Sequence, residues 1–117
     1  MNLKIWIEKQ LSGHIPSDVR AYNFNLYESE IDNQFDVQLI GCKEYDLDND
    51  DWACNPDYSS GENFYHFTAD GWEQALESFI VSVKEYLETC NLSNKLKAAK
   101  YITAGFVDGD LEVIVRN

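Results

Sequence analysis

The chain has 117 residues and a mass of 13.5 kDa, which suits one domain spanning residues 1–117 around a single core. Hydrophobic residues make up 44% and charged residues 26%, so disordered, collagen-like and low-complexity classes are excluded. Nine Lys and Arg stand against 21 Asp and Glu, a net charge of −12. Because binding to nucleic acid and to anionic membranes depends on Lys and Arg, both are poor partners, and a basic protein is the natural one.

The first part of the chain predicts three strands. Residues 3–8 alternate apolar and polar side chains, the period of a half-buried strand, and residues 9–20 carry turn formers that predict a loop. Two further alternating runs, near residues 21–27 and 35–42, flank a polar break and predict an antiparallel hairpin. Residues 44–62 have no periodicity and several Asp residues, so they predict a long loop, a kind of segment that is often functional.

The middle of the chain predicts a short strand and then a long helix. Residues 63–68 are an aromatic run typical of a strand. Asp70 and Glu73 form the D-x-x-E variant of a capping box, which marks a helix start. From Trp72 to Cys90 apolar residues recur at spacings of three and four, with polar residues opposite, so we expect an amphipathic helix whose buried face includes Trp72.

The C-terminal part predicts a second hairpin. Residues 95–100 fit either a brief helix or the entry to a strand. Residues 101–107 and 110–116 flank Asp108-Gly109, a pair that favours a type I′ turn between strands. The summed pattern predicts an α+β fold, with an antiparallel sheet of about six strands and one long amphipathic helix packed on one face.

No set of residues in the chain matches a known catalytic motif. The two histidines are His14, in a predicted loop, and His66, in the aromatic strand, where a packing or hydrogen-bonding role is expected. Three cysteines, Cys42, Cys54 and Cys90, lack C-x-x-C spacing, so neither a disulfide framework nor a zinc site is expected. We therefore expect no catalytic residues, no cofactor and no metal site, and no enzyme. Free thiols and the lack of a signal peptide favour the cytoplasm.

The acidic loop invites comparison with a calcium-binding loop. Asp46, Asp48, Asp50 and Asp57 fall at EF-hand positions one, three, five and twelve. Position six, which needs Gly, holds Asp51, and position twelve holds the shorter Asp in place of Glu. Three uses of the loop remain open: a divalent-ion site, a merely solvated segment, or a protein-contact surface.

The distribution of charge favours the contact surface. Residues 28–77 carry fourteen acidic side chains against one basic side chain, that of Lys43. Such a field costs stability through self-repulsion, and its physical benefit is to steer an oppositely charged partner. The predicted partner-binding residues are Glu44, Tyr45, Asp46, Asp48, Asp50, Asp51, Trp52, Asp57, Tyr58 and Glu62.

Aromatic residues lie among these carboxylates, and they have two possible roles. Rings inside a charged rim are the composition of a protein-binding hot spot. Alternatively, Tyr45 and Trp52 fold inward and cover the sheet, because a long loop needs apolar side chains to anchor it. The sequence leaves both roles open.

Several segments resemble bacterial immunity proteins, the single-domain partners of polymorphic or contact-dependent toxins. They are the acidic-aromatic residues 50–54, the strand of residues 64–68 with the helix after it, and the closing hairpin around residues 105–112. The resemblance implies a monomeric inhibitor that binds a cognate, basic toxin domain, often a nuclease, and blocks its site. Two alternatives remain: a small metal-dependent hydrolase that uses the acidic loop with His66, and an adaptor module that dimerises through an exposed strand edge.

Overall fold

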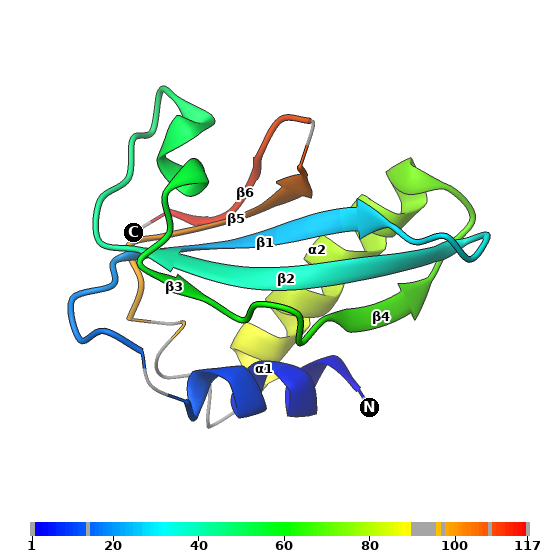
Figure 1. Ribbon diagram of the computed structural model, residues 1–117, viewed down its shortest axis with the longest axis horizontal. Helices are drawn as coiled ribbons and strands as arrows, with labels where there is room; N and C mark the ends of the chain where they lie inside the picture. Colours follow the sequence, from blue (N-terminus) through cyan, green and yellow to red (C-terminus); the bar gives the residue numbers. More distant parts are fainter. Residues whose placement is uncertain (1, 14, 90–95, 97, 108, 117) are drawn as a thin grey trace.

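The computed structural model describes residues 2–13, 15–89, 96, 98–107 and 109–116, and in these it is an α+β fold (Figure 1). The chain runs through α1 (Leu3–Leu11), β1 (Ala21–Glu28), β2 (Gln34–Cys42), the 3-10 helix η1 (Asp50–Cys54), β3 (Tyr58–Ser59), β4 (Tyr65–Thr68), α2 (Trp72–Thr89), β5 (Tyr101–Phe106) and β6 (Glu112–Arg116). The six strands form one open, mostly antiparallel sheet, which confirms the predicted fold class in outline.

The strand order is β3–β2–β1–β5–β6, and β4 pairs with the same edge of β2 as β3 does. β1 and β2 form the predicted hairpin, with Phe24 opposite Leu39. β1 and β5 are parallel, which differs from the predicted antiparallel sheet. The cause is the connection through α2: β4 runs parallel to β1, and a strand–helix–strand connection brings β5 back in the direction of β4.

The first element is a helix where residues 3–8 predicted a strand. Ile5, which the alternating pattern counted as buried, is 52% exposed, and Trp6, assigned to the polar face, is buried. The buried residues follow helical spacing: Leu3, Trp6, Ile7, Gln10 and Leu11. Asn2 caps the helix, since its side-chain oxygen accepts a hydrogen bond from the N–H of Ile5 at 2.8 Å.

α1 and α2 cover the same face of the sheet, called here the covered face (Figure 1). The Phe24 ring lies 5.2 Å from that of Phe79 on α2, and the Trp6 ring of α1 lies 5.8 Å from that of Tyr65 on β4. Trp6 also donates from its indole Nε1 to the carbonyl oxygen of Asn63 at 2.9 Å. Neither helix in the described part of the chain has the length and apolar character needed to cross a bilayer.

The predicted long helix is present as α2 and begins at Trp72 as predicted, but α1 is a further helix, and two details at the start of α2 differ from the prediction. The buried residues of α2 are Ala75, Phe79, Val83, Tyr86 and Leu87. Trp72, predicted as core, is 54% exposed, because its ring packs edge to face on Phe106, the last residue of β5, which is itself only partly buried. The predicted capping box is also wrong: Gln74, not Glu73, reaches back, and its Oε1 accepts from the N–H of Asp70 at 2.6 Å.

The C-terminal hairpin is confirmed as β5 and β6. Asp108 of the predicted turn, Cys90, His14 and part of the segment 95–100 lie outside the described residues. Leu96 is fully buried in the core cluster.

Gly105 on β5 leads to a prediction about stability. A Cβ there would lie 2.5 Å from the backbone oxygen of Asp110, so Gly105→Ala must displace the β5–β6 connection. We expect a loss of about 1–3 kcal/mol in the free energy of unfolding, measured with urea. Gly109→Ala is the matched control, because its nearest contact would be 3.7 Å and we expect a change below about 0.5 kcal/mol. Equal effects of the two variants would contradict this account.

Candidate functional site

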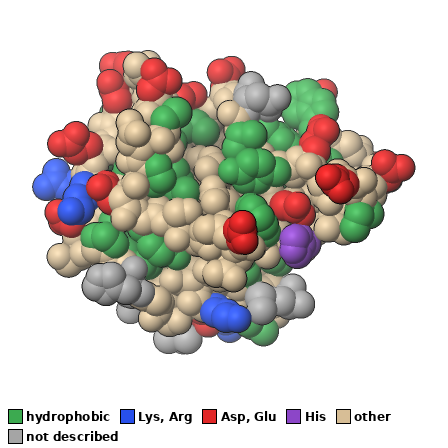
Figure 2. All heavy atoms as spheres, in the orientation of Figure 1, with side chains coloured by type: hydrophobic (Ala, Val, Ile, Leu, Met, Phe, Trp, Pro, Cys, Tyr) green, Lys and Arg blue, Asp and Glu red, His purple; other side chains and the backbone are tan. Residues whose placement is uncertain are grey.

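The acidic segment after β2 folds over one end of the other sheet face, called here the open face (Figure 1). The predicted loop of residues 44–62 contains two short regular elements, η1 and β3. Acidic side chains gather at the upper left of Figure 2, where Figure 1 places η1 and the chain before it. The candidate site is built on this segment.

Three aromatic rings hold the segment on the sheet. Tyr101 of β5 stacks on Tyr45 at 5.4 Å between ring centroids and contacts Trp52 at 5.7 Å. Tyr45 and Trp52 also meet edge to face at 6.5 Å. The indole Nε1 of Trp52 is buried without a hydrogen-bond partner among the described residues, so ring packing holds this side chain. These three rings are called the aromatic stack, and of the two roles left open, Tyr45 and Trp52 fold inward.

Side-chain oxygens fix the backbone of the segment. Asn49 caps η1 by accepting from the N–H of Asp51 at 2.9 Å, and Asp46 accepts from the N–H of Asp48 at 2.9 Å. Asp57 accepts from the N–H of Lys43 at 2.8 Å. Asp, Asn and Ser commonly close turns in this way, so the polar composition of the segment specifies its shape as well as its charge.

The segment borders an open hollow of about 620 Å³, called here the acidic hollow. Its lining is Cys42, Lys43, Glu44, Tyr45, Asp46, Asn49, Asp51, Trp52, Asn55 and Asp57. This lining contains four carboxylates and one ammonium group, that of Lys43, which itself lies 3.5 Å from Asp18. The hollow is suited to cationic groups.

The structure brings together six of the ten predicted partner-binding residues. Glu44, Tyr45, Asp46, Asp51, Trp52 and Asp57 line the acidic hollow. Asp48 is exposed outside it, Asp50 accepts from the N–H of Leu111 at 3.1 Å, and Glu62 is exposed in the turn before β4. Tyr58 packs against the core and donates to the carbonyl of Gln10 at 3.2 Å, and burial raises the pKa of its hydroxyl. Four predicted residues thus lie outside the lining of the hollow.

The base of the acidic hollow includes a buried thiol. Cys42 is 1% exposed and donates to the carbonyl of Trp52 at 3.5 Å. Burial, and secondarily the charge of Asp57, raises the pKa of the Cys42 thiol to about 11. The thiol is therefore neutral at neutral pH, and the charge of the hollow comes from its carboxylates and Lys43.

The calcium-loop positions do not converge. Asp46, Asp50 and Asp57 each accept from a different backbone N–H. Among the residues that the structure describes, no three His, Cys, Asp or Glu side chains form a group that could hold a metal ion.

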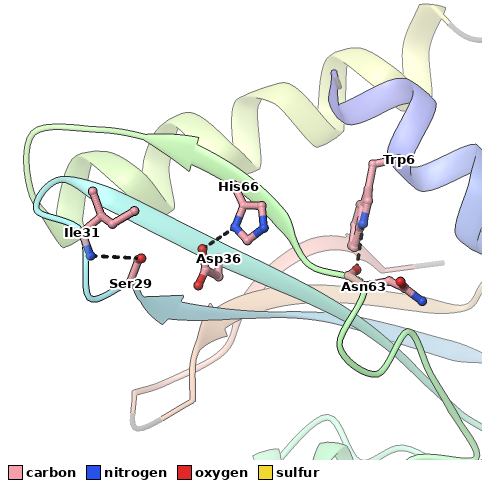
Figure 3. Close-up of polar contacts among 6 residues, drawn as sticks. All are labelled: Trp6, Ser29, Ile31, Asp36, Asn63 and His66. Carbon is pink, nitrogen blue, oxygen red and sulfur yellow. Dashed lines mark hydrogen bonds and ion pairs between the residues drawn. The ribbon is translucent and has the colours of Figure 1, made fainter.

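His66 lies away from the acidic hollow. Its Nδ1 is 2.6 Å from Oδ1 of Asp36, its cross-strand neighbour on β2 (Figure 3). Asp36 precedes Cys42 by six residues on the same strand, which is about 20 Å at the rise of an extended chain. The hydrolase alternative needs His66 together with the acidic loop, and the structure does not bring them together.

A chain of polar side chains on the open face was not predicted. Thr103 donates to Asn23 at 2.8 Å, Asn23 donates to Asn25 at 2.6 Å, and Asn25 and Tyr27 both donate to Gln38. Asn23 and Thr103 are fully buried, so this pairing satisfies polar groups that would otherwise be costly. The signal in the sequence is the polar half of the alternating strands, which alternation alone predicts to be solvated.

Comparisons with known proteins do not assign a family. No protein-family model matches the chain, and searches of curated proteins and of solved structures return no match.

Proposed function

We propose that this chain is an immunity-type protein that acts in the bacterial cytoplasm as a monomer and neutralises a cognate, basic toxin domain such as a nuclease. The observation that carries the proposal is the acidic hollow, whose described lining has four carboxylates and one ammonium group. The proposed role is stoichiometric binding, with no catalytic residue and no cofactor.

The chemistry of such a partner explains how one surface gives both affinity and inhibition. A nuclease binds the phosphates of its substrate with Lys and Arg side chains. Carboxylates held in a fixed arrangement form ion pairs with the same side chains and so block the substrate. Charge pairs buried in an interface couple by about 1.5–7 kcal/mol, the range that the barnase–barstar pair provides. The exposed acidic field also speeds association by steering.

Rigidity of the segment supports the proposal. The aromatic stack and the turn-closing carboxylates hold the lining side chains before any partner arrives. A preorganised surface loses less conformational entropy on binding, which raises affinity without added contacts.

The first experiment is co-expression with the product of the reading frame immediately upstream in the source genome. We expect a stoichiometric complex after purification at about 0.1 M salt that weakens at about 1 M, where exposed charges are screened. A toxic upstream product that is rendered harmless by this chain completes the test. A harmless product that does not co-purify would overturn the proposal.

A pair of charge-neutralised variants tests the acidic hollow itself. Asp46→Asn with Asp51→Asn keeps the shape of both side chains, and the amide introduced at the first position retains an oxygen that can close the turn. We expect association with the partner to slow about three- to tenfold at low salt and to depend less on salt, measured by stopped flow. Glu30→Gln with Asp32→Asn removes equal charge from the exposed β1–β2 turn and serves as the control. If both pairs slow association equally, the acidic hollow is not the contact.

A further inference from the structure

A second concave surface, called here the apolar groove, lies where β1 and β5 end and α2 begins. Its volume is about 710 Å³, and it is lined by Leu26, Tyr27, Glu28, Trp72, Leu76, Phe106, Val107, Gly109, Asp110 and Glu112. It shares no lining residue with the acidic hollow. Its residues come from three separate parts of the chain, and only the fold brings them together.

The floor of the apolar groove exposes large apolar side chains. Trp72 is 54% exposed and touches the Phe106 ring edge to face, with centroids 6.2 Å apart. Val107, which follows Phe106 in the chain, is 55% exposed. Single exposed apolar residues are common, but several that line one concavity mark an interaction site.

The rim of the apolar groove determines the charge of its occupant. Glu28, Asp110 and Glu112 contribute three carboxylates, and no Lys or Arg is among the described residues of the lining. Anionic lipid and nucleic acid are repelled by this rim. A second copy of the chain is disfavoured as well, because each copy carries a net charge of −12.

We propose that the apolar groove binds a short basic segment of a partner protein, which inserts one bulky apolar side chain against Trp72 and Phe106. Lys or Arg residues flanking that side chain pair with the three carboxylates of the rim. The apolar contact supplies the desolvated anchor, and the charges supply orientation and rate. This inference goes beyond the proposed function, because it concerns a different surface and holds for any basic partner.

The two surfaces are close enough for one partner to cover both. Asp50 of η1 accepts from the N–H of Leu111, which follows the rim residue Asp110, at 3.1 Å. Hydrophobic and acidic side chains continue along the upper border of the molecule in Figure 2, where Figure 1 places the β5–β6 connection and the start of α2.

The test uses the full chain and three short synthetic peptides. The first alternates glycine and lysine around one central phenylalanine, the second has alanine at the centre, and the third keeps phenylalanine but replaces lysine with glutamine. Binding is followed by the chemical shifts of the backbone amides. We expect the first peptide to shift amides of the apolar groove, and each of the other two to bind at least about tenfold more weakly.

Two variants with matched chemistry locate the site. Val107→Lys places a cation in the groove and should weaken the first peptide at least about tenfold, through like-charge repulsion. Val81→Lys is the control: Val81 is a 49% exposed valine of α2 outside the groove, and its change should have no effect. Both positions are exposed, so both variants are expected to fold.

Other outcomes overturn the inference. Equal binding of the phenylalanine and alanine peptides would show attraction by net charge alone, and shifts confined to the acidic hollow would place the peptide there. Self-association that buries the groove would make a second copy the occupant. Asp46→Asn with Asp51→Asn should leave binding in the groove unchanged, so failure of the groove is distinct from failure of the proposed function.

Discussion

Replacing Tyr101 with alanine is expected to lower the free energy of unfolding by about 3–5 kcal/mol and to release the acidic segment from the sheet. Tyr101 is 4% exposed, and its ring is the common partner of Tyr45 and Trp52. Without it, both rings lose their contact with β5, and the acidic hollow loses its shape. Urea unfolding gives the energy, and hydrogen exchange of the amides in residues 43–57 reports the release.

Tyr101→Phe is the matched control for this prediction. It keeps the ring and removes only the hydroxyl, so we expect a cost below about 1.5 kcal/mol and slow exchange in the segment. The alanine variant should speed hydrogen exchange in residues 43–57 more than in β1 and β2. The reason is that the Tyr101 ring packs on Tyr45 and Trp52, which belong to that segment. Equal acceleration everywhere would mean that the stack stabilises the fold without holding the segment.

The local patterns of the sequence predicted the elements well where only one periodicity, that of a strand or that of a helix, fitted the residues. The alternation around Phe24 and Leu39 and the helical spacing from Ala75 to Leu87 both describe faces that the structure buries. At residues 3–11 two periods fitted, and the strand interpretation needed Trp6 to be solvated. The free-energy cost of leaving an indole in water favours the helix, in which Trp6 joins Leu3 and Ile7 on one face.

Topology was less predictable, because it depends on contacts distant in sequence. Nothing in the pattern of residues 101–106 indicates that they pair with β1 in parallel. The same limit explains the error at Trp72. Periodicity indicates which face of a helix is apolar, but it does not indicate where the underlying sheet ends.

The two candidate surfaces show the same difference between features that are local in sequence and features that depend on distant contacts. Six of the residues that line the acidic hollow are close in sequence, so charge and composition alone selected them as candidate contact residues. The ring that supports them, Tyr101, lies in a strand about fifty residues further on, and no local signal links it to Trp52. The apolar groove combines Leu26, Trp72 and Phe106, and only the folded chain reveals it.

Stability of the chain is expected to fall as the pH rises above 9.0, and the Cys42 thiol, with its raised pKa, contributes to this fall. Its pKa is raised from 9.0 to about 11, chiefly by burial. Between these values the unfolded chain has lost the thiol proton and the native chain keeps it, so the native state binds more protons and loses stability with rising pH. The full contribution is present below pH 9.0, and at most about 3 kcal/mol is lost as the pH passes about 11, since about two pKa units separate the states.

Urea unfolding at a series of pH values from about 8 to 10.5 measures this loss against two variants. Cys42→Ala removes the titrating group, so its stability should decline less steeply than that of the parent chain. Cys54→Ala removes an exposed thiol of the same segment and should leave the parent slope unchanged. Tyr22 and Tyr58 also have a raised pKa, caused chiefly by burial, but they titrate in all three proteins and cancel in the comparison. Parallel curves for all three would mean that the Cys42 thiolate forms in the folded chain, and that the base of the acidic hollow is open to water.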